Sequence, residues 1–161
     1  MFRVGLGYDS HRFAPGRTLV LGQVRIAGCA GLAGHSDADV VLHAVTDAIL
    51  GAIAAGDIGE LFPDTDQKWR DADSGLFVRQ AVELAVKQGC RVANCDVTVL
   101  AEEPRLGPHN LPMRNNIASL LGVAPEAVSV KAKTNEGMGF VGRREGIAAL
   151  AVVALTSGRD G

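Results

Sequence analysis

The chain has 161 residues, 47% of them hydrophobic and 4% aromatic, and a formal net charge of -2 at pH 7. A chain of this length fits one domain, residues 1–161, which can bury roughly 70% of its unfolded-state surface without disulfide bonds. A nearly neutral chain with no clustered Lys/Arg face is not expected to bind nucleic acid. The apolar runs fall short of the roughly 20 residues of a membrane span, and no signal-peptide pattern is visible. Three cysteines without Cys-x-x-Cys spacing then favour a cytoplasmic protein with reduced thiols.

Two short apolar runs, residues 3–8 and 18–24, lie near the start of the chain and are separated by Gly and Pro. They predict two strands of a hairpin, joined by a loop over residues 10–17. Asp9 and His11 would then lie just beyond the end of the first strand.

The next segment is predicted to be a helix from an N-cap at Ser36 to a stop at Gly56. Asp39, His43 and Asp47 recur every four residues and form one polar stripe on this otherwise apolar helix. An ordinary solvated face would carry Lys and Glu, and this one carries neither. The stripe therefore indicates a site.

The remaining elements follow from periodicity and from Gly and Pro punctuation. We expect a loop over residues 56–67, a helix from Asp73 or Ser74 to just before Gly89, and a helix over 108–121 closed by Gly122. Strands are expected over 91–101, 128–134 and 147–155, with a glycine-rich turn over 135–146 before the last of them. Strands and helices that mix without strict alternation predict an α+β fold, with helices on one face of a mixed sheet.

Candidate metal ligands gather in the first half of the chain. Residues 26–67 hold seven acidic residues but no lysine or arginine, an imbalance that points to bound cations. Asp9, His11 and His43 supply two imidazoles and a carboxylate, the number of protein ligands at a catalytic zinc with one open position. Taken singly, Asp9 and His11 could belong to a turn and His43 to the core. Asp39 or Asp47 could hold the second nitrogen of His43.

Two further segments stay open at this level. Residues 62–66, Phe-Pro-Asp-Thr-Asp, are either a solvated loop or part of a site. Glycines 137, 139, 142 and 146 match neither a Walker motif nor a dinucleotide fingerprint.

Six ordered segments carry a resemblance that runs almost from end to end. They are Gly-Tyr-Asp-Ser-His at 7–11, Gly-His-Ser-Asp-Ala-Asp at 34–39, Leu-His-Ala-Val-Thr-Asp-Ala at 42–48, Gly-Asp-Ile-Gly at 56–59, Phe-Pro-Asp-Thr-Asp at 62–66, and Lys-Ala-Lys-Thr-Asn-Glu-Gly-Met-Gly-Phe at 131–140 with Gly-Arg at 142–143. In these segments the chain resembles the 2-C-methyl-D-erythritol 2,4-cyclodiphosphate synthases of the non-mevalonate isoprenoid pathway. Two departures are Ala38, where glycine is usual, and Lys133 and Asn135, which flank a single threonine.

The resemblance implies a four-stranded mixed sheet with helices on one face, assembled as a homotrimer with active sites between subunits. It implies conversion of 4-diphosphocytidyl-2-C-methyl-D-erythritol 2-phosphate, a cytidine diphosphate substrate, into the cyclic diphosphate with release of CMP. The implied cofactors are Zn²⁺ or another divalent transition metal at Asp9, His11 and His43, and Mg²⁺ or Mn²⁺ held by Glu136 and the substrate phosphates. His35 and Thr134 resemble the pair that stabilises the transition state.

The resemblance also implies a set of substrate contacts. The methylerythritol part would lie against Ser36, Asp57, Ile58, Gly59, Phe62, Pro63, Asp64, Thr65 and Asp66, close to Asp9, His11 and His35. Cytidine would be bound by Ala101, Glu102, Glu103, Pro104, Arg105, Leu106 and Gly107. The diphosphate would lie along Ala132, Lys133, Thr134, Asn135 and Glu136. Phe140 and Arg143 match positions that in some members line a cavity on the trimer axis and bind an isoprenoid diphosphate.

Two other classes of function remain as alternatives. A zinc-dependent phosphohydrolase acting on a nucleotide diphosphate would use the same three ligands, with water as the nucleophile. A trimeric interaction module would use the metal as a structural clamp, although structural zinc normally has four protein ligands.

Overall fold

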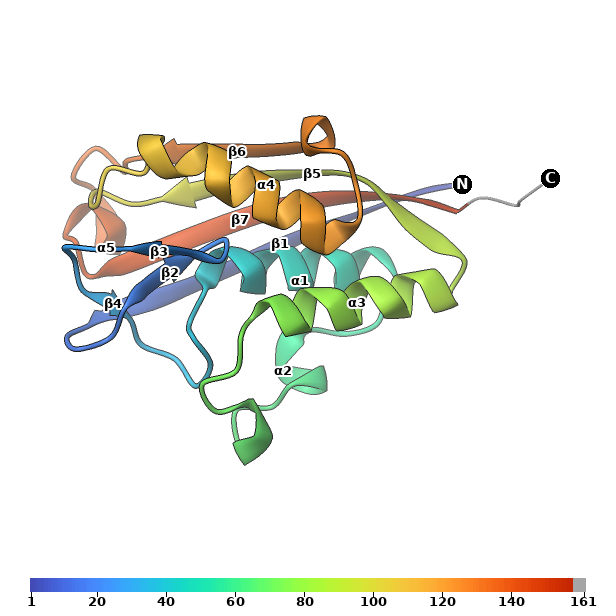
Figure 1. Ribbon diagram of the computed structural model, residues 1–161, viewed down its shortest axis with the longest axis horizontal. Helices are drawn as coiled ribbons and strands as arrows, with labels where there is room; N and C mark the ends of the chain where they lie inside the picture. The colour runs from blue at the N-terminus through green and yellow to red at the C-terminus, as the bar shows by residue number, and fades with distance from the viewer. Residues whose placement is uncertain (158–161) are drawn as a thin grey trace.

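Five strands form a mixed sheet in the order β4-β1-β7-β5-β6 in the computed structural model, which describes residues 1–157 (Figure 1). They are β1 (Phe2–Ala14), β4 (Gly31–Leu32), β5 (Cys90–Leu100), β6 (Val128–Lys133) and β7 (Gly146–Ser157). Only β5 and β6 are parallel neighbours; the other pairs are antiparallel. The predicted four-stranded sheet is wrong by one strand, because β4 extends the sheet beside the far end of β1. The last four residues of the predicted domain, 158–161, lie outside the described part.

Three long helices cover one face of this sheet, as the α+β prediction required (Figure 1). They are α1 (Val40–Ala52), α3 (Gly75–Lys87) and α4 (Asn110–Leu121). Shorter pieces are α2 (Ile58–Leu61), α5 (Gly139–Gly142) and the 3-10 turns η1 (Gln67–Trp69), η2 (Gly107–His109) and η3 (Pro125–Ala127). Within residues 1–157, no helix has the length and apolarity needed to cross a bilayer.

The predicted amino-terminal hairpin is wrong. β1 runs on through Asp9 and His11 to Ala14 and pairs with β7, while β2 (Leu19–Leu21) and β3 (Val24–Ile26) form a separate two-stranded sheet. The run of polar residues from Asp9 to Arg12 suggested a loop. In the strand these side chains point alternately to opposite faces of the sheet, with Asp9 and His11 on one face and Ser10 and Arg12 on the other. The two candidate ligands therefore lie on a paired strand, which holds their backbone rigidly.

The helix that carries His43 is shorter than predicted. It is capped by Asp39, whose carboxylate accepts a hydrogen bond from the Leu42 amide, and not by Ser36. Ala38 has φ 59, a left-handed conformation that interrupts the helix at the position where the resemblance leads one to expect glycine. At its other end the helix stops at Ala52, before Gly56.

Two glycines let α1 approach β1 closely. Gly5 and Gly7 occupy the same face of β1 as Asp9 and His11, since alternate residues of a strand share a face. A Cβ atom on Gly7 would lie 1.9 Å from the Ala44 carbonyl oxygen, and one on Gly5 would lie 1.8 Å from that of Ala48. Neither position can hold a larger residue unless α1 moves. The glycines thus set the distance between the strand that carries Asp9 and His11 and the helix that carries His43.

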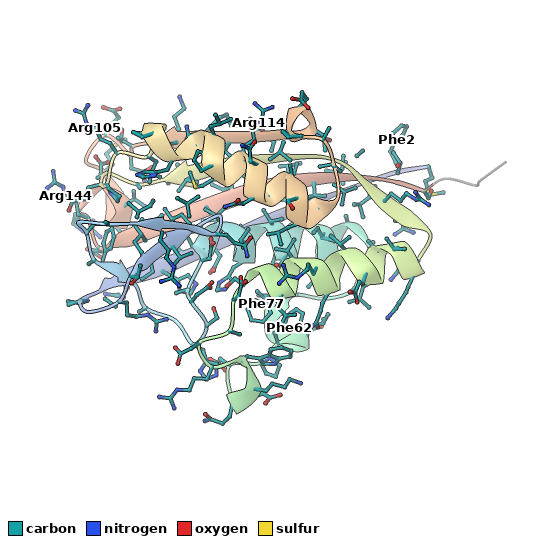
Figure 2. The ribbon with its side chains drawn as sticks, viewed as in Figure 1. Phe2, Phe62, Phe77, Arg105, Arg114 and Arg144 are labelled. Atoms are coloured by element: carbon teal, nitrogen blue, oxygen red, sulfur yellow. The ribbon has the colours of Figure 1, made fainter. Side chains whose placement is uncertain are left out.

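The other face of the sheet carries exposed apolar side chains from β1 and β7. Phe2, Val4, Leu6 and Tyr8 alternate along β1 and are 80%, 66%, 65% and 51% exposed. Val152 of β7 pairs with Leu6 and is 39% exposed. Figure 2 shows Phe2 projecting away from the sheet near one end of the molecule. These side chains form a row of exposed apolar residues, a kind of surface that is typical of interaction sites.

Candidate functional site

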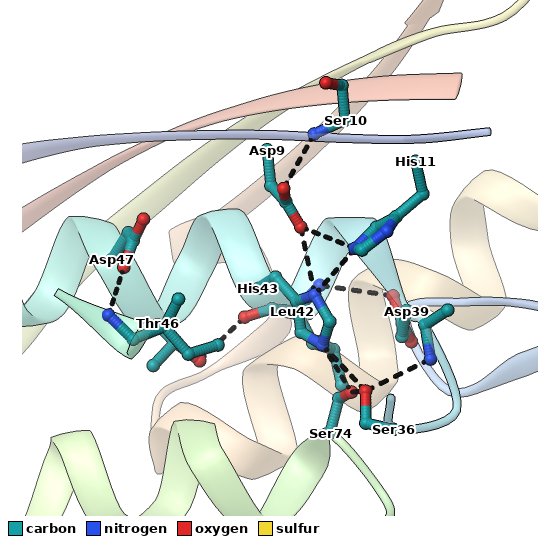
Figure 3. Close-up of polar contacts among 12 residues, drawn as sticks. Asp9, Ser10, His11, Ser36, Asp39, Leu42, His43, Thr46, Asp47 and Ser74 are labelled. Atoms are coloured by element: carbon teal, nitrogen blue, oxygen red, sulfur yellow. Dashed lines mark hydrogen bonds and ion pairs between the residues drawn. The ribbon is translucent and has the colours of Figure 1, made fainter. Parts of the chain in front are cut away.

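Asp9, His11 and His43 meet where β1 faces the first turns of α1 (Figure 3). Asp9 Oδ2 lies 2.9 Å from His11 Nε2 and 2.9 Å from His43 Nδ1, and the two ring nitrogens are 3.1 Å apart. A tetrahedral ion with bonds of about 2.0–2.1 Å keeps its ligand atoms roughly 3.3 Å apart. The triangle therefore fits a divalent transition metal with little adjustment. The three side chains that were grouped from the sequence do lie together in the fold.

The electrostatics of Asp9 suit a metal ligand. Burial would raise the pKa of this carboxyl, but hydrogen bonds from His11 and His43, with their charges, outweigh it and hold the pKa well below its usual range. Asp9 therefore stays ionised at neutral pH and can bind a cation without first losing a proton.

The second nitrogen of His43 contacts two serines and neither predicted aspartate. Nε2 lies 2.9 Å from Ser74 Oγ and 3.1 Å from Ser36 Oγ. Asp39 instead accepts hydrogen bonds from the amides of Gly22, Gln23 and Leu42, and is fully buried.

Asp47 bonds to a backbone amide, whereas the prediction was a contact with the second nitrogen of His43. Its Oδ1 accepts a hydrogen bond of 2.8 Å from the Ile58 amide, which ties the segment around α2 to α1. Burial raises the pKa of this carboxyl, partly opposed by that hydrogen bond.

A cavity of about 530 Å³ opens beside the three candidate ligands. Its wall contains most of the residues that the resemblance places near the methylerythritol part, together with Gly34, His43, Trp69 and Phe77. The assigned residues in the wall are Asp9, His11, His35, Ser36, Ile58, Gly59, Phe62, Pro63, Asp64 and Thr65. Asp57 and Asp66 are not in this wall, because their carboxylates cap α2 and η1. Of the Phe-Pro-Asp-Thr-Asp run, residues 62–65 thus line the cavity and Asp66 does not.

Three aromatic rings form an apolar floor in the cleft. Phe62 lies 4.7 Å from Phe77 and 5.2 Å from Trp69 between ring centroids, and Trp69 lies 5.6 Å from Phe77. Figure 2 shows Phe62 and Phe77 next to each other below the helices. Only two weak signals in the sequence could have indicated this cluster, namely the single tryptophan and the inward position of Phe77 on α3.

Arg17 is a further residue that the sequence reasoning missed. Its guanidinium donates hydrogen bonds to the carbonyls of Gly34 at 2.8 Å and of Ser36 at 2.5 Å. It therefore holds the loop around His35 from both sides. The two contacts span 17 and 19 residues, so no local pattern could have predicted them.

The predicted nucleotide and diphosphate residues form a second group, outside the cleft wall. Glu102 Oε1 accepts hydrogen bonds from the amides of Asn135 and Gly137 at 2.9 and 3.2 Å, and Thr134 Oγ1 donates to Glu136 Oε1 at 3.1 Å. Figure 2 shows Arg105 at the end of the molecule, far from Phe62 and Phe77. Within residues 1–157, Thr134 and Glu136 do not line the 530 Å³ cavity.

The other predicted positions lie near this second group. Glu103 and Pro104 line a separate cavity of about 430 Å³ with Cys29 and Arg144. Phe140 lines one of about 360 Å³ that also touches His11, and Arg143 is exposed and bonded to Glu145 at 2.7 Å.

A triad suited to a transition metal, set beside a cleft with an apolar floor, is the arrangement of a metal-dependent enzyme. The YgbB family model matches residues 2–156, and the chain belongs to this family, that of the 2-C-methyl-D-erythritol 2,4-cyclodiphosphate synthases. It is 57% identical to the synthase of Symbiobacterium thermophilum over 97% of this chain and 99% of that one.

Solved structures agree with this assignment. The bifunctional IspDF of Campylobacter jejuni superimposes with a TM-score of 0.94 and 42% identity over 98% of this chain, which spans 43% of that longer protein. A CDP complex of IspF from Plasmodium falciparum superimposes with a TM-score of 0.84 and 33% identity, over 97% of this chain and 96% of that one.

Proposed function

We propose that the chain converts 4-diphosphocytidyl-2-C-methyl-D-erythritol 2-phosphate into 2-C-methyl-D-erythritol 2,4-cyclodiphosphate and CMP, in the non-mevalonate isoprenoid pathway. The observation that carries the proposal is the triad of Asp9, His11 and His43 beside the aromatic cleft, in a chain 57% identical to a synthase of that name. The unpaired Cys29, Cys90 and Cys95 support a cytoplasmic location.

In the proposed reaction an oxygen of the substrate's 2-phosphate attacks the β-phosphorus. A new P–O bond closes the ring, the P–O bond to CMP breaks, and CMP departs with the bonding electron pair. No strong base is needed, because the attacking phosphate oxygen is already ionised at neutral pH. The geometry of the substrate, more than its reactivity, is what the site must control.

Two ions are proposed. Zn²⁺ would be held by Asp9, His11 and His43, whose donor set of two imidazoles and a carboxylate suits it. Mg²⁺ or Mn²⁺ would be held by Glu136 with the substrate phosphates. When bound, such ions supply Lewis-acid neutralisation of phosphoryl charge and a template for the bent diphosphate.

The chain's own side chains have complementary proposed roles. His35, in the cleft wall, and Thr134 donate hydrogen bonds to phosphoryl oxygens as charge develops on them. Phe62, Trp69 and Phe77 exclude water from the methylerythritol part, which disfavours hydrolysis.

Cytidine is proposed to bind along residues 101–107, and the CDP complex of the Plasmodium falciparum protein supports a nucleotide of this type. The segment lies outside the wall of the methylerythritol cleft. We therefore propose that a neighbouring subunit supplies it, together with Thr134 and Glu136.

The product decides between this proposal and a zinc-dependent phosphohydrolase. Incubation with the cytidylyl substrate and magnesium is expected to release CMP and to give phosphorus NMR signals of a cyclic diphosphate. CMP release with a linear phosphate product would favour the hydrolase. If the zinc-loaded protein released no CMP, both the cyclisation and the hydrolase function would be ruled out.

The exposed apolar face of β1 and β7 indicates a partner, and we propose that this partner is the homotrimer that the family resemblance implies. Light scattering at micromolar protein should give three times the chain mass of 16.8 kDa. Leu6→Glu places a charge in the middle of that face and should give monomers without activity. Val86→Glu, at an exposed apolar position on α3, is the matched control and should remain trimeric. A fully active monomeric parent protein would contradict both the trimer and the shared site.

Glu136→Gln is expected to lower cyclisation roughly a hundredfold, the usual effect of removing one group that stabilises developing charge. Glu136 has φ 52, a strained conformation of the kind found at functional sites. The variant should keep its zinc, and added magnesium should restore part of the activity. Glu126→Gln, at an exposed carboxylate on η3, should change neither property. A Glu136→Gln enzyme that turns over at the parent rate with zinc alone would refute the second ion site.

A further inference from the structure

The segment that carries His35 borders two cavities. Gly34, His35 and Asp64 line both the 530 Å³ cleft and a second cavity of about 470 Å³. Residues 33–39 connect β4 to α1 and form neither helix nor strand. A segment next to two hollow spaces has fewer packed neighbours than the core, so its backbone hydrogen bonds decide where His35 lies.

Three successive carbonyl groups of this segment accept hydrogen bonds from other parts of the chain. The Arg17 guanidinium donates to the Gly34 carbonyl from Nη1 and to the Ser36 carbonyl from Nη2. The carbonyl between them, that of His35, accepts from the Asp71 amide at 2.8 Å. One planar guanidinium therefore bridges the two residues on either side of His35 and fixes their spacing.

Arg17 is itself anchored to the sheet. It lies in the turn between β1 and β2, and its own carbonyl accepts a hydrogen bond of 2.9 Å from the Gly31 amide of β4. Its side chain is half-buried and lines the second cavity. The guanidinium clamp, meaning the pair of hydrogen bonds from Arg17 to Gly34 and Ser36, thus ties the His35 segment to the strand that precedes it.

The clamp acts on the backbone, and the imidazole of His35 has only a weak restraint of its own. Its Nε2 lies 3.3 Å from the Asp66 carbonyl oxygen, which is longer than an ordinary N–H···O hydrogen bond. Among the described residues, 1–157, Arg17 belongs to the second cavity and not to the wall of the cleft. Any effect of Arg17 on the reaction therefore passes through the segment that it holds.

We propose that Arg17 is a positioning residue that holds the backbone of His35 where its imidazole reaches the reacting phosphoryl group. The inference rests on the proposed function, in which His35 stabilises the transition state from the cleft wall. A displacement of about 1 Å at such a group can cost roughly a hundredfold in rate. Loss of the clamp therefore lowers turnover, whereas substrate affinity, which depends on the whole cleft, changes little.

Steady-state kinetics of Arg17 variants measure this effect. Arg17→Met removes both hydrogen bonds and should lower kcat for cyclisation about 10–100-fold, while KM and bound zinc change by less than about twofold. Arg17→Lys keeps the charge but has no planar fork, so its kcat should lie between those of Arg17→Met and the parent. Arg70→Met removes the other arginine of the same cavity, and as the matched control it should leave kcat unchanged.

A double-mutant cycle determines whether Arg17 acts through His35. In a His35→Ala background no imidazole is left to position, so Arg17→Met should lower kcat further by less than about twofold. An equal fold-loss in both backgrounds would indicate a general structural role and would overturn the inference. Parent kcat in folded Arg17→Met, or a loss of the same size in Arg70→Met, would also overturn it.

Amide hydrogen exchange tests the clamp without any substrate. The Asp71 amide, which donates to the His35 carbonyl, should exchange at least about tenfold faster in Arg17→Met, relative to the amides of β7 as the internal reference for global stability. Unchanged relative exchange at Asp71 in folded Arg17→Met would overturn the inference. Faster exchange in a protein whose parent form does not cyclise the substrate would leave the clamp standing and remove the proposed function, and with it the role of His35.

Discussion

Replacing His43 with alanine is expected to remove zinc from a protein that still folds. Asp9 and His11 would remain as two ligands, too few to retain the ion through dialysis. Because a metal ion contributes several kcal/mol of transition-state stabilisation, and each 1.36 kcal/mol is tenfold in rate, cyclisation should fall about a thousandfold or more. Elemental analysis after dialysis, with circular dichroism as the check on folding, measures the first effect.

The matched control is His109→Ala, at the histidine of η2. It should retain zinc, fold and activity. Stoichiometric zinc in a folded His43→Ala protein would rule out this ligand assignment.

Gly7→Ala is expected to damage both the fold and the metal centre. The added methyl group would lie 1.9 Å from the Ala44 carbonyl oxygen, a backbone atom of α1 that cannot move without the helix. Overpacking of this kind costs typically 1–3 kcal/mol, and a clash with backbone belongs near 3 kcal/mol. Because α1 carries His43 and β1 carries Asp9 and His11, the same displacement should weaken zinc binding at least about tenfold.

Thermal unfolding and zinc titration measure the two effects separately. For a chain of this size, about 3 kcal/mol corresponds to a fall of roughly 6–12 °C in melting temperature. Gly51→Ala is the control within the same helix, since a Cβ there meets no atom within 4 Å. It should stabilise by about 0.5–1 kcal/mol through helix propensity. An unchanged melting temperature and zinc affinity in Gly7→Ala would show that α1 does not press on β1 at this point.

The elements that were predicted from the sequence are those with a clear local signal. The helix before Gly89 and the helix closed by Gly122 both appear, as α3 and α4, and Gly122 has the expected left-handed φ of 68. The strands predicted over 91–101 and 128–134 match β5 and β6 to within a residue. Apolar periodicity and glycines that end helices are local features of the sequence. The elements that they predict therefore do not depend on contacts with distant parts of the chain.

The errors arose where tertiary contacts override local pattern. β1 extends through Asp9 and His11 because β7 pairs with it along its length, and that partner begins 132 residues after Ala14, at Gly146. Ala38 adopts a left-handed conformation inside what reads as a continuous helix. Asp39, expected to face His43, is buried and accepts hydrogen bonds from the distant amides of Gly22 and Gln23 and from the Leu42 amide of its own helix.

The difference between local pattern and long-range contact also explains which parts of the site were predicted and which were missed. The three candidate ligands could be chosen by residue type, because two imidazoles and a carboxylate have a recognisable chemistry. The partners of His43 and of the His35 loop could not, because Ser74 is 31 residues from His43 and Arg17 is 19 residues from Ser36. A serine or an arginine has too many ordinary uses to be selected without the fold.

The central claim is that the substrate's own 2-phosphate, and not water, attacks the β-phosphorus. Turnover of the zinc-loaded enzyme in oxygen-18 water, followed by mass spectrometry of CMP and of the second product, tests it most directly. Cyclisation transfers no solvent oxygen, so both products should contain none of the label and the second should have the mass of the cyclic diphosphate. One labelled oxygen in either product would contradict the account and assign the chain to the hydrolases.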